Sequence, residues 1–333
     1  MSRLLKFLSL SGRPLWVRIT GYSAAALLVL LTAVGWYWSR TPDVFWVNAE
    51  PDGRKVVGYA TVDTLVRVGE TLLDKPGGYL TNDRLPPGIV LDNMPNWEQG
   101  VLQQVRDLAR VIRNDYSRSQ SQSREDADVS IAEPKFFFEP DSWILPPTES
   151  RYREGIEGFS AYRDRLAGRT QPEAQFFARA DNLREWLAQV EKRLGDLSKR
   201  LGDSVADSVI NTDLAGDSAA EANSNLPDSV GVRTSWFEID DIFFEARGTS
   251  WALVHFFRAV ELDFAQVLED KNARASVRQI IRELESALQP LRSPIVLNGS
   301  GYGLFANHSL VMANFIARAN AAVINLRELL DQG

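Results

Sequence analysis

The sequence predicts an all-α protein, in which one N-terminal transmembrane helix precedes an antiparallel helical-bundle soluble domain with long loops. Three observations predict this fold class. Residues 19–38 form a long run without charge. Several later segments repeat apolar residues at the spacings of three and four that place them on one helix face. Prolines and glycines gather between those segments, where loops are expected.

The composition is that of a globular protein with a substantial core. Of the 333 residues, 44% are hydrophobic and 24% are charged, as in ordinary folded proteins. The formal charge of −7 is uneven, because residues 1–40 hold five basic residues and no acidic one. Removing those five from the 37 basic residues leaves 32 against 44 acidic ones, a charge of −12 for residues 41–333. Such a surface repels a phosphate backbone, so we expect no nucleic-acid partner.

The uncharged run Ile19–Trp38 is predicted to cross a lipid bilayer once. At about 1.5 Å per residue it spans roughly 30 Å of hydrocarbon. Trp16 precedes it and Trp36, Tyr37 and Trp38 end it, which places amphipathic rings in the two headgroup zones. The competing interpretation is a cleaved signal peptide. The run is longer than the apolar core of such a peptide, which has about 7 to 15 residues.

The basic segment 1–18 sets the expected orientation. Four of its residues are basic, and only Arg40 closely follows the span. Because positive charge is retained on the cytoplasmic side, this segment is predicted to be cytoplasmic and the domain after the span to lie outside the cytoplasm.

Residues 39–60 contain two prolines and two glycines and are predicted to form an extended tether. Residues 61–210 form the first helical region, with amphipathic helices expected over about 61–73 and 96–112. Asn96 is the expected N-cap of the second helix.

Residues 133–147 combine four prolines with six large apolar side chains. Because proline blocks a helix interior, we predict an extended strap laid over the end of the bundle. The alternative is a segment that docks a partner through exposed apolar side chains. In that alternative the candidate partner-binding residues are Phe136, Phe137 and Trp143.

Residues 176–201 carry the clearest periodic pattern. Apolar residues alternate at spacings of four and three, which is a heptad seam of the coiled-coil type. The seam consists of Phe176, Ala180, Leu183, Leu187, Val190, Leu194, Leu197 and Leu201. Pro172 suits the first turn of this helix. The seam requires a partner, and an antiparallel helix of the same chain is favoured over a second subunit.

Residues 211–232 are rich in small polar residues and are predicted to form a flexible linker. Residues 233–333 form the second helical region, which we expect to pack on the first. Its segment 236–264 is apolar on nearly every face, as is typical of a central helix. Further helices are expected over about 277–291 and 308–330.

No motif predicts a cofactor, a metal or a reaction. The densest acidic cluster is Glu238, Asp240, Asp241 and Glu245, and the solvated start of a helix explains it better than acid–base chemistry does. Whether this cluster is functional stays open. The only two histidines lack the spacing of a zinc site. His255 is expected to be a bonded core histidine, and His308 to lie at a helix cap.

The turn Asn298–Gly303 resembles an anion-binding loop only superficially, because it has no lysine and no preceding strand. A flexible turn is the favoured interpretation.

Several strings in the chain resemble the bacterial family called domain of unknown function 2333. They are Gly78–Asp83, Leu91–Glu98, Ser117–Asp126, Ser142–Pro146, Phe177–Leu183 and Phe244–Gly248. The resemblance covers essentially the whole chain. It implies a single-pass inner-membrane protein of Gram-negative bacteria with its C-terminal domain in the periplasm, and it implies no reaction or ligand.

Three functions remain open. The leading hypothesis is a non-enzymatic interaction or scaffold component of the cell envelope, bound to the bilayer through Ile19–Trp38 and to an envelope protein through the strap. The alternative is periplasmic binding of a small molecule or lipid, which predicts an apolar pocket of several hundred Å³. A second alternative is an envelope-acting hydrolase that uses Asp241 and Glu245.

Overall fold

The computed structural model describes residues 14–47, 54–118, 125–171, 174–205, 209–210, 229–230, 235, 238–293, 295–299 and 304–332. Several sequence predictions lie outside these ranges. They are the predictions for the basic residues before Pro14, for Pro172, for most of the linker 211–232 and for the centre of the turn 298–303.

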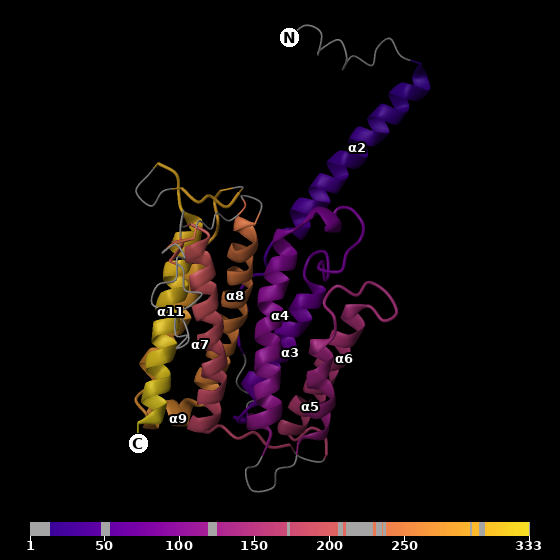
Figure 1. The fold of residues 1–333 in the computed structure, drawn as a ribbon. Helices are drawn as coiled ribbons and strands as arrows, with labels where there is room; N and C mark the ends of the chain where they lie inside the picture. Colours follow the sequence, from indigo (N-terminus) through magenta and orange to yellow (C-terminus); the bar gives the residue numbers. More distant parts are fainter. Residues whose placement is uncertain are drawn as a thin grey trace, which may run out of the picture.

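Helices make up nearly all the regular structure, which confirms the all-α prediction (Figure 1). In chain order they are α2 (Leu15–Trp38), α3 (Tyr59–Asp74), η3 (Gly88–Val90), α4 (Asn93–Val111), η4 (Ile112–Tyr116), α5 (Ala127–Ala132), η5 (Glu133–Phe137), α6 (Thr148–Leu166), α7 (Ala180–Asp203), α8 (Ile239–Asp263), α9 (Ala265–Asp270), α10 (Arg274–Ala287) and α11 (His308–Asp331). η3 and η5 are 3₁₀ turns, and η4 is a π-helical turn that continues α4. β1 (Val209–Ile210) pairs with β2 (Ser229–Val230) in a short antiparallel ladder.

α2 projects from the end of the bundle, while the C-terminus lies at the opposite end (Figure 1). It begins at Leu15, four residues before the predicted span, and only Gly35 of its residues is buried. Thr32 Oγ1 donates to the Leu28 carbonyl at 2.8 Å, which pairs a polar group inside the helix as an apolar environment requires. α2 is thus a candidate membrane span by length, composition and exposure.

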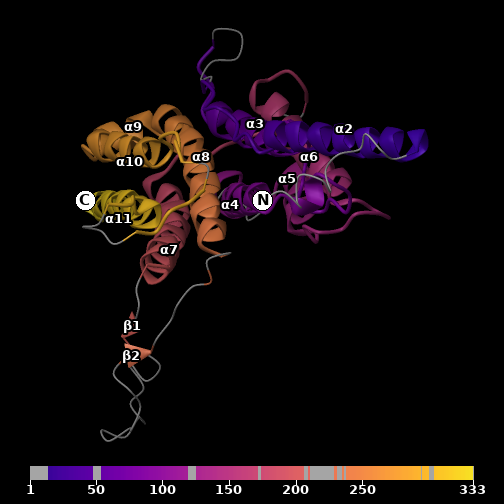
Figure 2. The same cartoon turned by 90° about the horizontal axis from the view of Figure 1, so that it is seen from above.

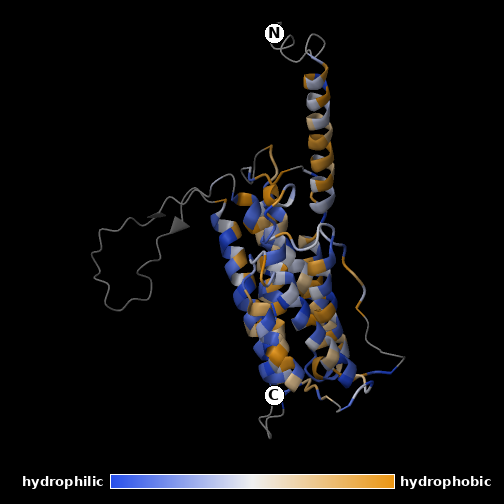
Figure 3. Ribbon diagram, turned by 90° about the vertical axis from the view of Figure 1, so that its right-hand side faces the viewer, coloured by the Kyte–Doolittle hydropathy of each residue, from blue (hydrophilic) through white to orange (hydrophobic). Residues whose placement is uncertain are grey.

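α11 is also long and apolar enough to cross a membrane. It lies inside the bundle instead, where it packs on α7 and α10. The hydropathy colouring shows the isolated α2 apart from the packed helices (Figure 3).

Seen from above, α3, α5 and α6 gather on one side and α7, α9, α10 and α11 on the other (Figure 2). α4 and α8 form the most extensive contact between the two groups, and α3 also packs on α8. α4 and α8 run parallel, because Asn96 meets Asp241 near their starts and Tyr116, just after α4, meets Phe264, just after α8. The other principal pairs are antiparallel. In the α3–α6 pair, for example, Arg153 meets Asp74 and Arg163 meets Asp63.

Two glycines allow α4 and α8 to approach until their backbones touch. A Cβ atom on Gly100 would lie 2.1 Å from the Glu245 carbonyl oxygen, and one on Gly248 would lie 2.0 Å from the Trp97 carbonyl oxygen. Any side chain at either position would hold the helices apart. The junction of the two halves therefore depends on these two glycines.

The heptad seam of α7 lies in the core from Leu183 to Leu201. Its partner is α11 of the same chain, and the pair is antiparallel, because Arg184 pairs with Asp331 and Ser198 Oγ lies 3.5 Å from the Ala313 carbonyl. The predicted start of this helix was wrong, since α7 begins only at Ala180. Before Ala180, the backbone forms hydrogen bonds with another part of the chain instead of a helical turn. Phe177 N–H donates to the Tyr116 carbonyl at 2.7 Å.

The prediction of an extended strap over 133–147 was wrong in its first third. Residues Glu133–Phe137 form the 3₁₀ turn η5. Pro134 is compatible with it because a proline at the first turn loses no hydrogen bond. α6 has no counterpart among the predicted helices, since only a narrow stripe of buried residues interrupts its many charged ones.

The start of the predicted tether lies on α8. Phe45 N–H donates to His255 Nε2 at 3.0 Å, and its ring stacks on the imidazole with centroids 3.8 Å apart. Trp251 Nε1 donates to the Asp43 carbonyl at 3.2 Å. The chain that leaves α2 is therefore attached to the central helix at once.

Candidate functional site

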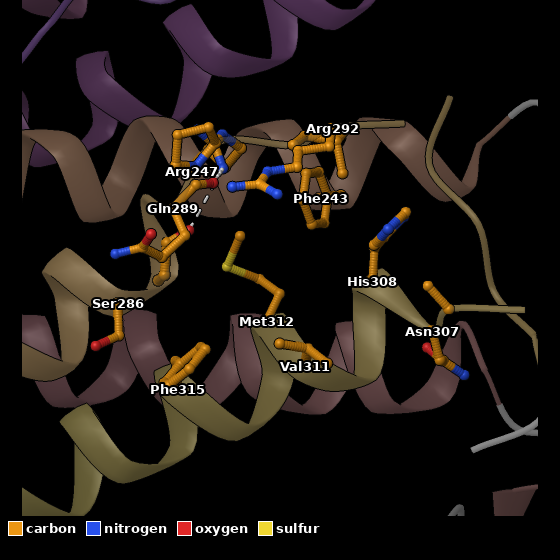
Figure 4. A pocket seen from close by; sticks show the side chains of 14 residues that line it. Phe243, Arg247, Ser286, Gln289, Arg292, Asn307, His308, Val311, Met312 and Phe315 are labelled. Atoms are coloured by element: carbon orange, nitrogen blue, oxygen red, sulfur yellow. Dashed lines mark hydrogen bonds between the residues drawn. The ribbon is translucent and has the colours of Figure 1, made fainter. Parts of the chain in front are cut away.

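An apolar pocket opens between α8, α10 and α11 (Figure 4). Its volume is about 430 Å³, within the range of about 300–1,000 Å³ that is usual for small-molecule sites. The apolar lining comes from the three helices and from the loop after α10. It consists of Phe243, Ala287, Pro290, Leu291, Ala306, Val311, Met312 and Phe315.

Local sequence signals create the pocket at this place. α10 ends at Ala287, just before Pro290, whose ring cannot continue a helix. α11 begins after Asn307, whose side-chain oxygen accepts the Leu310 N–H at 2.8 Å as an N-cap. The ends of two helices thus leave space beside the first turns of α8.

Arg247 of α8 is the buried cation of the pocket, with 8% of its surface exposed. Its guanidinium donates to the carbonyls of Leu288 at 3.2 Å and Gln289 at 2.9 Å. These bonds place a positive charge at the carbonyl end of α10, where the helix dipole favours it. Burial lowers the pKa of Arg247, and among the residues that the structure describes no carboxylate pairs with it. A ligand anion would meet no competing charge partner there.

Arg292, His308 and Gln289 are further polar groups of the lining. Arg247 and Arg292 lie on one side of the pocket, opposite Val311, Met312 and Phe315 (Figure 4). His308 Nδ1 accepts the Leu297 N–H at 2.9 Å, which leaves a proton on Nε2 in the neutral ring. Burial lowers the pKa of His308, so the neutral form is favoured.

A second cavity, of about 770 Å³, connects this region with the end of α2. It is lined by Trp36, Tyr37 and Arg40 on one side and by α8 and the loop after α10 on the other. The two cavities share Arg247, Pro290 and Leu291. The apolar pocket therefore lies next to the aromatic residues that end the candidate membrane helix.

Chemically, the pocket offers an apolar interior with cationic groups on one side. This combination suits a molecule with an apolar body and an acidic head. Within the described ranges, no three or more His, Cys, Asp or Glu side chains are grouped so that they would hold a metal ion.

The acidic cluster is used in contacts between helices. Both oxygens of Glu245 accept from Arg200 of α7, at 2.9 and 2.5 Å. Asp241 Oδ1 accepts from Asn96 Nδ2 at 2.7 Å. Burial, with repulsion from the neighbouring Asp240, raises the pKa of Asp241. Neither Asp241 nor Glu245 lines the pocket, so the structure does not bring the two carboxylates to a common substrate site.

The three candidate partner-binding residues have different environments. Phe136 is 1% exposed and packs between Tyr152 and Phe159, so it is a core residue and not a surface contact. Phe137 and Trp143 lie at the surface, with 38% and 52% exposed. For these two residues the contact with a protein partner stays a prediction.

The prediction for His255 is confirmed, because its side chain is fully buried and bonded to Phe45 and Trp251. The capping role expected of His308 was wrong: His308 is the first residue of α11, but Asn307 caps the helix and His308 accepts the Leu297 N–H instead. The pocket residues could not be predicted from the sequence, because they come from three segments that are far apart in the chain. The only sequence signal near them is the break of periodicity at Pro290.

The comparisons with known proteins give one match. The family model of DUF2333, described as an uncharacterized protein conserved in bacteria, matches residues 11–333. This result confirms the resemblance found in the sequence. No curated protein and no solved structure matches the chain.

Proposed function

We propose that this chain, which belongs to the DUF2333 family of bacterial proteins, is a single-pass inner-membrane protein whose bundle lies in the periplasm and binds an acidic amphipathic molecule. The observation that carries the proposal is the pocket of about 430 Å³ between α8, α10 and α11. The structure favours ligand binding over a scaffold role, because it supplies a cavity of suitable size and chemistry.

The proposed anchoring is supported by the exposure of α2 and by the charge before it. A helix with one buried residue in 24 needs another apolar environment, and the excess of basic residues before it favours a cytoplasmic N-terminus. A C-terminal alkaline phosphatase fusion should be active and should sediment with membranes. An intact mass near 37.3 kDa would distinguish an anchor from a cleaved signal peptide. Activity of a cytosolic reporter alone would contradict the proposed orientation.

The proposed ligand follows from the lining. Phe243, Val311, Met312 and Phe315 provide apolar surface, which drives burial of an acyl chain or a similar body. Arg247 and Arg292 provide charge for a carboxylate or phosphate head. Because the pocket adjoins the cavity lined by the residues that end α2, a membrane molecule would reach it without crossing much water.

The direct test fills the pocket. Met312→Trp places a large ring in the cavity, and Ala317→Trp places the same ring on an exposed position of the same helix. Binding of nitroxide-labelled palmitate to the full-length protein is measured by electron paramagnetic resonance. Met312→Trp should abolish the immobilised signal, while Ala317→Trp should keep it. Equal binding by both variants would refute the pocket as the site.

A second variant tests the acidic head. Arg292→Gln should weaken displacement of the probe by palmitate more than displacement by the neutral alcohol of the same chain length. If both competitors are affected equally, the charge of Arg292 does not contribute to recognition.

A second candidate function is the scaffold role, which is supported by one observation. Trp143, Ile144 and Leu145 are 52%, 63% and 89% exposed in one loop, and exposed apolar clusters are typical of protein contacts. It predicts a defined protein that co-purifies with the wild type and is lost in both Phe137→Ala and Trp143→Ala. Retention of that protein by both variants would exclude this surface.

A further inference from the structure

We propose that the segment Leu85–Leu91, which contains η3, is a second membrane contact that inserts its exposed apolar side chains into the headgroup zone beside α2. This inference rests on the proposed anchoring and goes beyond it, because it assigns a lipid-binding role to a part of the soluble domain.

The segment has the composition of an interfacial anchor. Its sequence, Leu-Pro-Pro-Gly-Ile-Val-Leu, contains no charge and no polar side chain. Leu85, Ile89 and Val90 are 68%, 57% and 72% exposed. In a soluble domain, grouped apolar side chains that face outward mark an interaction site.

The position of the segment identifies the bilayer as the partner. Gly35, in the last turn of α2, is buried because the segment packs on it. A Cβ atom there would lie 3.4 Å from Pro87 Cβ and 3.8 Å from Leu91 Cδ2. Gly35 directly precedes Trp36 and Tyr37, the aromatic residues that favour the headgroup zone. If α2 spans the bilayer, side chains packed against this turn lie at the same depth.

The backbone N–H groups at the centre of the segment do not need water as a hydrogen-bond partner. Pro86 and Pro87 have no N–H group. The N–H groups of Ile89, Val90 and Leu91 donate within the segment, to the carbonyls of Leu85, Pro87 and Gly88 at 3.2, 3.1 and 2.9 Å. Paired N–H groups remove a large cost of entering the interface. A protein-docking loop does not need this internal pairing, which favours lipid as the occupant.

A second contact would fix the bundle on the membrane. Trp38 packs on Gly77, where a Cβ atom would lie 2.8 Å from the indole. The end of α2 is therefore held by the connection between α3 and α4 on two sides. With the segment also in lipid, the bundle cannot rotate freely about α2.

The experiment uses the absence of cysteine from the chain. Single cysteines are introduced into the full-length protein at Val90, at Leu28 in α2 and at Ile131, an apolar position on α5 that is 67% exposed. Each variant is labelled with bimane and reconstituted into phosphatidylcholine vesicles, with and without lipids that carry a nitroxide.

Leu28→Cys and Val90→Cys should lose emission in nitroxide vesicles, while Ile131→Cys should not. If Leu28→Cys is quenched and Val90→Cys behaves like Ile131→Cys, the second contact is refuted and the anchor stands. If Leu28→Cys is not quenched, the anchoring itself fails, and with it this inference. If the emission of Val90→Cys is lost through contact with a co-purified protein and does not depend on lipid nitroxide, the inference is also refuted.

Discussion

The contact between α4 and α8 makes a quantitative prediction, because two glycines separate its backbones. Gly100→Ala would place a Cβ atom 2.1 Å from the Glu245 carbonyl oxygen, and Gly248→Ala would place one 2.0 Å from the Trp97 carbonyl oxygen. Ordinary contact begins at 3.4 Å, so α4 and α8 must separate by more than about 1 Å in a closely packed interior.

The expected magnitude follows from two opposing effects. Overpacking that side chains can absorb costs about 1–3 kcal/mol, and here the obstacle is backbone, which places the cost at or above the upper end. Alanine gains about 1 kcal/mol over glycine in helix propensity. We therefore expect each variant to lose about 2–3 kcal/mol of unfolding free energy, and the pair to be less than additive because both open the same contact.

The assay is urea unfolding of the full chain in detergent, with circular dichroism as the readout. Gly195→Ala in α7 is the matched control, because its added Cβ would have only an ordinary contact, 3.5 Å from Asn320 Nδ2. It should be neutral or slightly stabilising. If Gly100→Ala falls within about 0.5 kcal/mol of this control, the range of an ordinary surface substitution, the backbone contact between the helices is refuted.

Three further predictions concern buried ionisable groups. Lys75 pairs with Glu98, and both side chains are fully buried, so Lys75→Met should lower the free energy of urea unfolding by about 3–5 kcal/mol. Adding Glu98→Gln should recover part of the loss, and an additive double variant would contradict the pairing. Burial raises the pKa of Asp263 to about 6 from 3.8, so the folded state takes up a proton first and stability from this group rises as the pH falls from about 6 to about 4. The shift of 2.2 corresponds to about 3 kcal/mol. Asp263→Asn should remove this rise, which urea unfolding at pH 7 and pH 4 would measure, and an unchanged pH profile would contradict it. Burial lowers the pKa of His255 to about 3, so protonation of the unfolded state removes stability as the pH falls below about 6.5. In the folded protein the proton resonance of the His255 ring should stay constant between about pH 8 and about pH 5. A titration midpoint near 6.5 would refute its burial.

Periodicity allowed the prediction of the helices whose buried stripe is wide. The regular stripe of α7 and the apolar faces of α8 identify a partnered helix and a central helix without any structure. α6 was missed, because its buried residues Tyr152, Ile156, Phe159 and Tyr162 stand among charged ones. The prolines around Phe136 predict extended chain, because they exclude a helix interior, whereas a short 3₁₀ turn tolerates them.

The candidate pocket could not be predicted, because its lining is a property of packing. Phe243, Leu291 and Met312 carry no shared pattern in the sequence, and each is explained there as an ordinary core residue. They meet because α10 ends at Ala287 and the start of α11 lies beside the first turns of α8.

The attachment of Asp43 and Phe45 to α8 limits the distance between the helical domain and the end of α2. Only residues 39–42 separate the last residue of α2 from the Asp43 carbonyl that Trp251 binds. Even fully extended, the five residue steps from Trp38 to Asp43 cover no more than about 18 Å. If α2 spans a bilayer as proposed, the domain stays close to the membrane surface, and a longer connection alone would not free it, because Gly77 and Pro87 still pack on Trp38 and Gly35.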